Sequence, residues 1–345
     1  MAAETLDRDA FYDRARAADL TPLWRVIQGL VAKEPASPAA PALWRYDHVR
    51  PFLIEAGALI SAEEAERRVL ILENPALPTE SKITRSLYAG LQVVMPGEIA
   101  RVHRHVAAAL RLVVEGVGGY TTVDGERGPM SPGDFVVTPS WTWHEHGNEG
   151  SDPVIWLDVL DVHVVNLLDC GFREDHFERP ASQRRPAGAS TAEAALNMLP
   201  VSYDTTRNTS PIFNYPYERT RAALHGIARF REPEGPFGFK MRYINPVNGD
   251  WAIPTIATWA QLLPRGYRTS PYRSTDGTIF IVVEGTGYSV IGGRRFEWGE
   301  HDVFVVPSWC ESFHHADAES VLFGASDRVI QEKLGVWREC WWERP

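Results

Sequence analysis

The sequence predicts a mainly β protein built from two similar β domains. From Leu87 onward, short apolar runs such as LQVVM, LRLVV and FVVT alternate with Gly, Pro and Asp turn signals, a pattern typical of an all-β barrel or sandwich. The same pattern returns near Trp251 and continues to about Ser326. A chain of 345 residues is long enough for two domains that each bury a core of their own.

An internal duplication supports this division. Three residues recur in the same order in both β regions: Glu115, Gly116 and Tyr120 in the first, and Glu284, Gly285 and Tyr288 in the second. Segments 133–141 (GDFVVTPSW) and 301–309 (HDVFVVPSW) also match. The offset is 169 residues at the first match and 168 at the last, so one hairpin of the second copy is expected to be a residue shorter.

Helices are expected before, between and after the β regions. Apolar positions three or four apart in residues 5–33 predict one or two amphipathic helices. Ser61 and Glu64 resemble a capping box, so a short helix over residues 62–70 should carry Arg67 and Arg68. The expected domains are an N-terminal helical arm (1–80), a first barrel (81–172), a linker and extension with a helix near 192–198 (173–245), a second barrel (246–326) and a C-terminal helical tail (327–345).

The composition excludes several classes of protein. The formal charge is −10 without a basic block, which argues against nucleic acid or an anionic membrane as partners. No apolar run is long enough to span a membrane and no leader is evident, so a cytoplasmic location is expected. Cys170, Cys310 and Cys340 read as separate reduced thiols. An anionic substrate would require arginines that reverse the acidic field inside a pocket.

Three histidines of the first β region form a candidate metal site. His103 and His105 are two apart, so on a strand both side chains point to one face, and His144 can approach them from an antiparallel neighbour. Three imidazoles that converge in this way suit Fe, Zn, Cu or Ni. The second copy has Tyr272, Ser274 and Ser312 at the corresponding positions, so one metal per chain is expected. The second barrel is then structural.

The spacing around these histidines resembles both motifs of the cupin superfamily: Gly97, His103, His105 and Gly116, then Gly133, Pro139, His144 and Asn148. The glutamate that usually follows the histidine pair is absent, because Ala109 and Leu110 stand there. With the stretches ERRVLILENP, LYAGLQVVMPGE, VDGER and PSWTWHEHGN, the chain resembles the gentisate 1,2-dioxygenase family, which includes salicylate and 1-hydroxy-2-naphthoate dioxygenases.

This resemblance implies a bicupin fold of two double-stranded β-helix (jelly-roll) barrels, Fe(II), O2 as cosubstrate, an aromatic hydroxy acid as substrate, and a homotetramer. For gentisate, the ring would open between the carboxyl- and hydroxyl-bearing carbons to give maleylpyruvate. Salicylate, a substituted salicylate or 1-hydroxy-2-naphthoate remain alternatives, because chelation needs only the carboxylate and one hydroxyl. A non-catalytic metal-binding sensor, or a zinc, nickel or manganese cupin isomerase or hydrolase, also remains open.

The resemblance also assigns roles to pocket residues. Arg111, six residues after His105, would point inward on the same strand and bind the substrate carboxylate, the alternative being an internal salt bridge. His146 would contact a substrate hydroxyl or oxygen, and Asp158 would orient it or take the hydroxyl proton. The alternative for His146 is a hydrogen bond to Asp158 or backbone alone. The expected substrate contacts, each with a plain structural alternative, are Tyr88, Gly90, Gln92 and Arg67.

Overall fold

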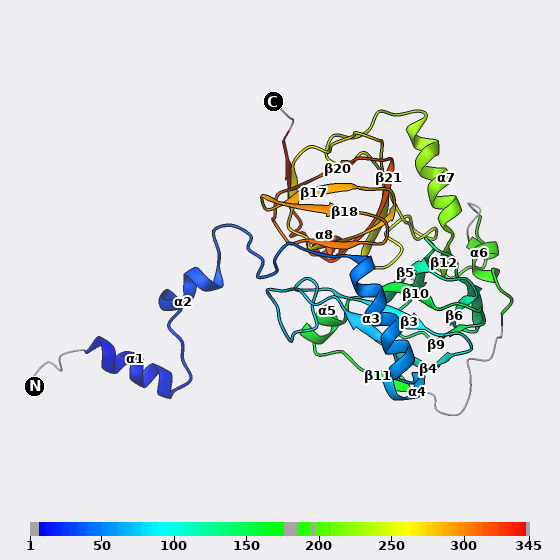
Figure 1. Cartoon of the computed structure of the whole chain (residues 1–345). Coiled ribbons are helices and arrows are strands. Elements are labelled where there is room, and N and C mark those ends of the chain that lie inside the picture. Colours follow the sequence, from blue (N-terminus) through cyan, green and yellow to red (C-terminus); the bar gives the residue numbers. More distant parts are fainter. Residues whose placement is uncertain (1–6, 176–184, 195–197, 207, 343–345) are drawn as a thin grey trace, which may run out of the picture. The chain divides into compact units, whose positions relative to one another are not determined.

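The computed structural model describes residues 7–175, 185–194, 198–206 and 208–342 (Figure 1). The chain divides into two units, residues 1–36 and 37–345. The first unit contains two helices, α1 (Arg8–Ala17) and α2 (Leu23–Leu30), where one or two were expected. Among the described residues, every helix is too short or too polar to span a lipid bilayer.

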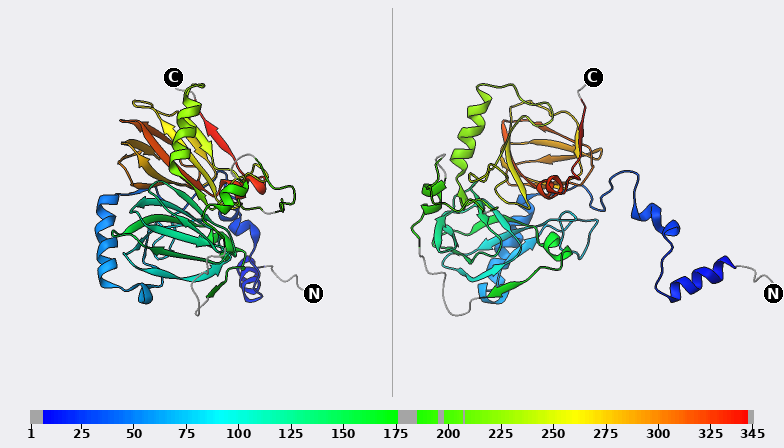
Figure 2. Two further views of the ribbon diagram at one scale, coloured as in Figure 1. Left: turned by 90° about the vertical axis from the view of Figure 1, so that its right-hand side faces the viewer. Right: turned by 180° about the vertical axis from the view of Figure 1, so that it is seen from behind.

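The second unit contains two barrels, each made of a six-stranded and a five-stranded sheet (Figure 2). The six-stranded sheet of the first barrel has the order β12 (Asn214–Tyr215), β8 (Phe135–Thr138), β5 (Ala109–Glu115), β10 (Val154–Leu160), β3 (Tyr88–Val94) and β2 (Val69–Ile71). Its five-stranded sheet has the order β11 (Arg173–Asp175), β4 (Ile99–His105), β9 (His144–Asn148), β6 (Gly119–Val123) and β7 (Glu126–Pro129).

The second barrel repeats this arrangement strand for strand. Its six-stranded sheet has the order β1 (Ala42–Trp44), β19 (Val303–Val306), β16 (Thr278–Glu284), β21 (Ser320–Ser326), β14 (Ala257–Leu263) and β13 (Phe239–Arg242). Its five-stranded sheet has the order β22 (Glu339–Trp341), β15 (Tyr272–Ser274), β20 (Ser312–Ala316), β17 (Gly287–Ile291) and β18 (Arg294–Trp298). The mainly β fold of two double-stranded β-helix barrels is therefore confirmed.

The duplication extends to details of the backbone. Residues 116–118 connect β5 to β6, whereas only 285–286 connect β16 to β17, so the shorter hairpin of the second copy lies here. Trp141 and Trp309 occupy matching turns with φ of +60° and +61°. Both tryptophans adopt a left-handed backbone conformation that residues other than glycine seldom take. The two copies therefore share backbone geometry even at this unfavourable position.

The two copies exchange their first strands. Strand β1 precedes the first barrel in the sequence but pairs with β19 of the second barrel, while β12 pairs with β8 of the first. A helix follows each exchanged strand, α3 (Tyr46–Leu59) and α7 (Tyr217–Ala228). The backbone N–H of Tyr46 donates to Asp302 at 2.8 Å, and that of Tyr217 donates to Asp134 at 2.9 Å. The exchange is therefore reciprocal and is fixed by equivalent hydrogen bonds.

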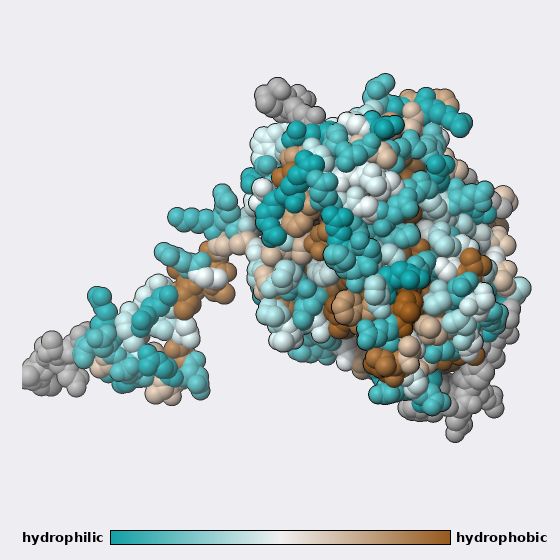
Figure 3. All heavy atoms as spheres, in the orientation of Figure 1, coloured by the Kyte–Doolittle hydropathy of each residue, from teal (hydrophilic) through white to brown (hydrophobic). Residues whose placement is uncertain are grey.

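The two six-stranded sheets also share one hydrophobic core. Because side chains alternate along a strand, Leu110 and Leu112 of β5 face outward into this core, whereas Arg111 faces the interior of the first barrel. The outward faces of both sheets meet through apolar side chains that include Leu91, Leu110, Leu112, Val137, Leu157, Ile279, Ile281, Val305 and Phe323. Outside this core, the face of the molecule seen in Figure 3 is mainly hydrophilic with scattered apolar residues.

Several expected elements differ from the structure. The helix expected over 62–70 ends after one turn, as α4 (Ala62–Ala65), although the Ser61 hydroxyl does cap it by accepting from the Glu64 N–H at 3.1 Å. Glu66 then has φ of +54°, which breaks the helix, and the chain continues into β2. Arg67 and Arg68 therefore lie on an extended segment. Arg68 is buried in an ion pair with Glu98 rather than solvated.

The connecting and closing segments contain more structure than expected. Strand β10 ends at Leu160 and α5 (Val162–Leu167) follows, whereas β11 and β12 of the first barrel come later in the chain. The linker helix is α6 (Ala189–Ala194), which begins earlier than expected, and residues 195–197 of the expected helix lie outside the described residues. Over residues 327–342, the closing segment is helical only in α8 (Arg328–Lys333), because β22 then pairs with β15. Strands β1 and β2 lie within residues 1–80, so the expected N-terminal helical arm is not entirely helical.

Candidate metal centre and substrate pocket

The three predicted histidines converge inside the first barrel. Strands β4 and β9 are antiparallel neighbours, and their pairing sets His103 opposite His144. The ring centroids of His103, His105 and His144 lie 4.3 to 5.2 Å apart, and one ring nitrogen from each lies within 4.8 Å of the other two. This is the one group of potential metal ligands found among the described residues. The chain can therefore hold one metal ion at this position.

Backbone carbonyls orient two of the rings for metal binding. His105 Nδ1 lies 2.7 Å from the Ala107 carbonyl oxygen, and His144 Nδ1 lies 2.8 Å from that of Thr142. Each Nδ1–H donates to its carbonyl, which leaves the Nε2 lone pair toward the centre. His144 Nε2 is buried without a hydrogen-bond partner in the described structure. A buried acceptor without a partner costs free energy, and a metal ion would satisfy it.

The protonation state of the histidines also suits a metal. Burial lowers the pKa of His103 to about 2, and the charge of Arg67 adds to this effect. Burial likewise lowers the pKa of His105, and lowers that of His144 well below its usual range. The three rings are therefore neutral at physiological pH, which is the form that binds metals.

Arg67 lies directly beside the metal ligands. Its Nη2 is 2.6 Å from His103 Nδ1 and 2.7 Å from the Arg101 carbonyl oxygen. Burial, together with the charge of Arg111, lowers the pKa of Arg67 to about 10. Among the described residues, no carboxylate lies within ion-pair distance of its guanidinium. Arg67 is therefore a half-buried cation that has hydrogen bonds but, among the described residues, no counter-ion.

Arg111 and Asp158 face each other in the barrel interior. They are register partners on β5 and β10, with Arg111 Nε 3.2 Å from Asp158 Oδ1, and both side chains are more than nine-tenths buried. Neither of these two atoms has a hydrogen-bond partner in the part of the chain that the structure describes. Burial raises the pKa of Asp158 to about 6, although the Arg111 charge opposes the rise. The internal salt bridge considered for Arg111 is therefore present, with imperfect geometry.

The inward direction of Arg111 has a different cause from the one expected. His105 ends β4, whereas Arg111 lies on β5 of the opposite sheet, so alternation along a single strand does not relate them. Arg111 points inward because its neighbours Leu110 and Leu112 face the core shared by the barrels. Thr138 on the adjacent strand β8 accepts a hydrogen bond from Arg111 Nη1. No local sequence pattern indicates this contact.

His146 is held by a chain of hydrogen bonds. Its Nε2 lies 2.9 Å from Arg111 Nη2, and its Nδ1 lies 3.0 Å from Thr121 Oγ1. A guanidinium only donates, so Nε2 accepts and Nδ1 carries the hydrogen, which it donates to Thr121. The Thr121 hydroxyl then donates to Met130 Sδ at 3.2 Å. The contacts of His146 are thus Arg111 and Thr121, rather than Asp158 as considered above, and Thr121 was not expected.

Tyr88, Gly90 and Gln92 lie on β3, at the far side of β10 from Arg111. Gly90 is the register partner of Asp158, and Gln92 is buried. A Cβ atom on Gly90 would lie 2.5 Å from Val69 Cγ1 and 3.1 Å from the Tyr88 hydroxyl. The space that glycine leaves is therefore taken by these two side chains. Burial, then the Asp158 charge, raises the pKa of Tyr88 and keeps its phenol protonated.

A cavity opens from His103 toward the surface and carries excess positive charge. Its lining comprises Glu66, Arg67, Arg101, Val102, His103, Arg173 and Asp175. Arg173 is paired with Glu66 at 2.9 Å and with Asp175 at 3.2 Å. Arg67 and Arg101 have no such pairing among the described residues. The arginines thus reverse the acidic charge of the chain at this site, as an anionic substrate requires.

Comparisons with known proteins agree with this geometry. The Cupin domain model matches residues 90–160, which include the three histidines. A gentisate 1,2 dioxygenase 1 of Aquipseudomonas alcaligenes is 51% identical to the chain, over 98% of the chain and 97% of that protein. The chain belongs to the gentisate 1,2-dioxygenase family. Like other members of this family, it is a ring-cleaving dioxygenase.

Further family members act on related aromatic acids. A 5-aminosalicylate 1,2-dioxygenase of a Comamonas species is 37% identical, over 96% of the chain and 90% of that protein. The solved structure of a salicylate 1,2-dioxygenase from Pseudoaminobacter salicylatoxidans, as an adduct with gentisate, is 30% identical with a TM-score of 0.92. That similarity covers 100% of the chain and 96% of the solved protein. The family resemblance seen in the sequence is thereby confirmed.

Proposed function

We propose that this dioxygenase cleaves gentisate with O2 between the carboxyl- and hydroxyl-bearing carbons and releases maleylpyruvate, with Fe(II) held by His103, His105 and His144. The observation that carries the proposal is the convergence of three histidines, of which His144 is buried, beside Arg67, a cation without a counter-ion among the described residues. The relative that is 51% identical, and named for gentisate, favours this substrate. All atoms of gentisate and O2 are retained in maleylpyruvate, so no further reductant is needed.

Two arginines can bind the substrate carboxylate. Arg67 lies next to His103 and has N–H donors but no carboxylate partner among the described residues. Arg111 already has Asp158, but the two charged atoms make no hydrogen bond, so an incoming carboxylate can improve on that contact. Both arginines lie close enough to the histidines to affect their pKa values. Binding between them would bring the ring of the aromatic acid to the triad.

His146 and Asp158 are the proposed proton-handling groups. Burial, and then the charge of Arg111, lowers the pKa of His146 well below its usual range, so the ring is a neutral acceptor at Nε2. Asp158, with a pKa of about 6, can take up a proton near neutral pH. Both side chains contact Arg111, so protonation of one of them affects the other through Arg111. Tyr88, Gly90 and Gln92 would complete the wall around the substrate ring.

The donor set is suitable for iron. Three neutral imidazoles leave the full charge and open coordination positions on a divalent ion. When bound by the three histidines, Fe(II) would supply Lewis-acid polarisation of the substrate and activation of dioxygen. The absence of a carboxylate ligand follows from Ala109 and Leu110, which are buried and apolar. A homotetramer is part of the proposal and can be tested by light scattering.

Salicylate-type substrates are the second candidate. They are favoured by the relative named for 5-aminosalicylate and by the solved salicylate dioxygenase. Chelation requires only the carboxylate and one hydroxyl, and both arginines would bind either substrate. The two candidates differ in the second ring hydroxyl of gentisate.

Oxygen consumption is the deciding experiment. The protein is reconstituted with Fe(II) without oxygen and then offered gentisate, salicylate and 1-hydroxy-2-naphthoate in parallel. Rapid oxygen uptake with gentisate alone, together with near-ultraviolet absorbance of a ring-opened product, supports the proposal. Comparable turnover of salicylate transfers the function to that branch, and no uptake with any substrate refutes it. Full activity with zinc in place of iron would contradict the metal assignment.

A further inference from the structure

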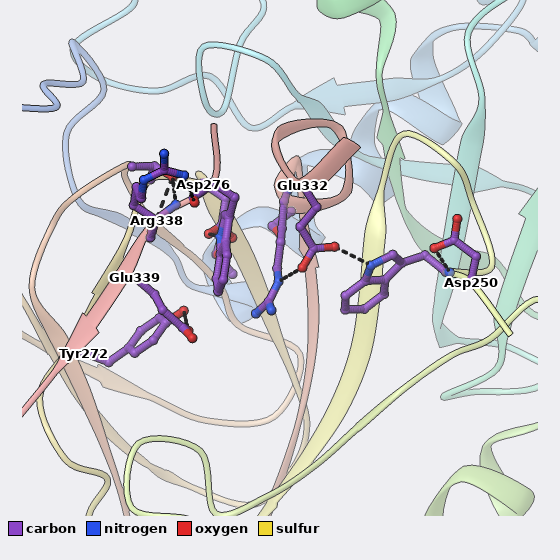
Figure 4. Close-up of polar contacts among 12 residues, drawn as sticks. Asp250, Tyr272, Asp276, Glu332, Arg338 and Glu339 are labelled. Carbon is purple, nitrogen blue, oxygen red and sulfur yellow. Dashed lines mark hydrogen bonds and ion pairs between the residues drawn. The ribbon is translucent and has the colours of Figure 1, made fainter. Parts of the chain in front are cut away.

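The second barrel contains a cavity at the place where the first barrel holds its histidines. Tyr272 and Ser312 are register partners on β15 and β20, just as His103 and His144 are partners on β4 and β9. Tyr272, Ser274 and Ser312 all line this cavity. The Tyr272 hydroxyl donates to Glu339 at 2.9 Å (Figure 4), so it is already engaged. The metal ligands are absent, but the interior space of the barrel persists.

Gln261 offers this cavity a donor that has no partner. Its side chain is 98% buried and lines the cavity. The Oε1 atom accepts from Trp259 Nε1 at 3.4 Å, whereas Nε2 has no hydrogen-bond partner in the described structure. A buried amide N–H without an acceptor is costly, typically by about 1–3 kcal/mol. The position therefore favours an acceptor that arrives from outside the chain.

His314 offers a second donor. Its Nδ1 lies 2.7 Å from Ser289 Oγ, and this oxygen also accepts from Trp298 Nε1 at 2.9 Å. The Ser289 hydroxyl hydrogen is therefore directed to His314 Nδ1, because no other acceptor for it is found among the described residues. The ring hydrogen of His314 then resides on Nε2. Since His314 lines the cavity, this N–H is available to a ligand.

Lys240 supplies the charge. It lies on β13 directly opposite Gln261, with its ammonium 3.9 Å from the ring centroid of Trp259 and 4.4 Å from that of Phe237. In the described structure it forms no ion pair with a carboxylate. Burial, and then the charge of Arg328, lowers its pKa to about 8, so most of it remains protonated at neutral pH. Lys240 is thus a cation held by aromatic faces without a counter-ion.

The remaining lining keeps the cavity positive. Arg273 and Arg328 line it as well, and Asp276 is the one carboxylate among the lining residues. Asp276 is occupied as an acceptor, because Trp337 Nε1 donates to it at 2.9 Å and the Thr278 hydroxyl at 3.2 Å. Figure 4 shows Asp276 within this polar cluster. Arg328 is paired with Glu332 at 2.7 Å, so Lys240 and Arg273 are the two lining cations that keep the cavity positive against one engaged carboxylate.

We propose that the cavity of the second barrel binds a small carboxylate anion, such as formate or acetate, through Lys240, Gln261 and His314. All three available groups are N–H donors, which matches a ligand that only accepts. The free space between the side chains accommodates about two water molecules, which is the size of such a carboxylate and too small for an aromatic acid. This site is separate from the triad of the first barrel.

Thermal denaturation of the full-length chain tests this site with sodium formate as the probe. Formate should raise the Tm by a few degrees more than sodium chloride at equal ionic strength, because a ligand of the folded state stabilises it. Lys240→Met removes the charge at similar size, and Gln261→Leu removes the donor. In both variants, formate should raise the Tm no more than chloride does. Lys33→Met, an exposed lysine of the first unit, is the control and should respond like the unaltered chain.

Comparison of these variants separates the outcomes. If Lys240→Met responds to formate as strongly as the unaltered chain, the ion acts elsewhere and the site is refuted. If formate and chloride give the same Tm in the unaltered chain, the site is also refuted. Gln261→Leu keeps the test valid if Lys240→Met does not fold. Neither result depends on ring cleavage, so failure here leaves the proposed function untouched.

Discussion

The two barrels have the same strand order but differently filled interiors. Across the register β14–β21–β16, the second barrel has Trp259, Gly324 and Phe280. Across β3–β10–β5, the first barrel has Gly90, Asp158 and Arg111 at the same places. The charged pair of the first barrel thus corresponds to glycine and an aromatic ring in the second.

This difference is an exchange of volume between neighbouring strands. A Cβ atom on Gly324 would lie 2.2 Å from Trp259 Cε2, so the large indole requires glycine on the next strand. In the first barrel the glycine is on β3, where Gly90 leaves space for Val69 and Tyr88, and the larger residue is Asp158. The fold therefore tolerates either arrangement. What distinguishes an enzymatic interior from a structural one is a small set of polar side chains.

The largest expected effect comes from the ligand positions. His144→Ala should lose metal and ring cleavage, by more than roughly a hundredfold in metal affinity, because even an outer partner of a ligand typically contributes 10–100-fold. Ser312→Ala, at the same register position of the second barrel, should change neither. Metal analysis after anaerobic reconstitution, together with oxygen uptake, measures both variants. Loss of metal from Ser312→Ala would mean that the second barrel also holds a functional centre.

The charged pair should show the next largest effect. Arg111→Met leaves Asp158 buried without its cation, which typically costs roughly 3–5 kcal/mol of folding stability. Arg111→Met combined with Asp158→Asn should recover much of this loss, because the second barrel folds without either charge. Urea unfolding measures stability, and oxygen uptake should remain low in both variants. If the double variant is no more stable than the single one, the two side chains are not energetically coupled.

The pH dependence should be a property of the first barrel alone. Below pH about 6, Asp158 becomes protonated and no longer fixes Arg111, so kcat/KM should fall by up to tenfold per pH unit. Asp158→Asn should have a lower kcat/KM near neutral pH, and its kcat/KM should not fall further below pH about 6. The folded pKa lies above the ordinary 3.8, so the stability from this group is present at low pH and is lost as the pH rises through about 6. Protonation of Asp158 should therefore lower the activity at acidic pH without unfolding the protein.

The smallest expected effect concerns Thr121, which accepts a hydrogen bond from His146. Thr121→Val removes the acceptor for His146 Nδ1–H and should lower kcat by about tenfold with little change in KM. Ser289→Ala, the equivalent change behind His314, should leave kcat unaltered. Thr121→Ser should restore most of the rate. Equal losses in Thr121→Val and Ser289→Ala would indicate a general structural effect.

The sequence predicted the strands and the convergence of the three histidines well, for physical reasons. Alternating apolar runs and turn residues indicate strands locally, and His103 and His105 share a face wherever they form a strand. The duplication was visible only between Glu115 and Trp141 and their counterparts. The structure extends it to the exchanged strands and to the pair β11 and β22, because these short elements owe their geometry to their partners.

The pocket contacts were harder to predict because they depend on tertiary structure. Arg67 and Arg68 were expected on a helix, but Glu66 ends it and only the pairing of β2 with β3 fixes their directions. The contacts of Arg111 with Thr138, and of His146 with Thr121, join strands that are distant in sequence. No local pattern encodes such pairs.

The reciprocal exchange of first strands has a consequence for synthesis on the ribosome. Strand β1 emerges early, but its partner β19 is made roughly 260 residues later, which at ~5–20 residues per second is a delay of roughly 13–50 s. During this time the outward face of the first barrel, with Leu110 and Leu112, has no second sheet to cover it. The nascent chain is therefore exposed to aggregation until its last third is complete, and chaperone binding should concentrate in that interval.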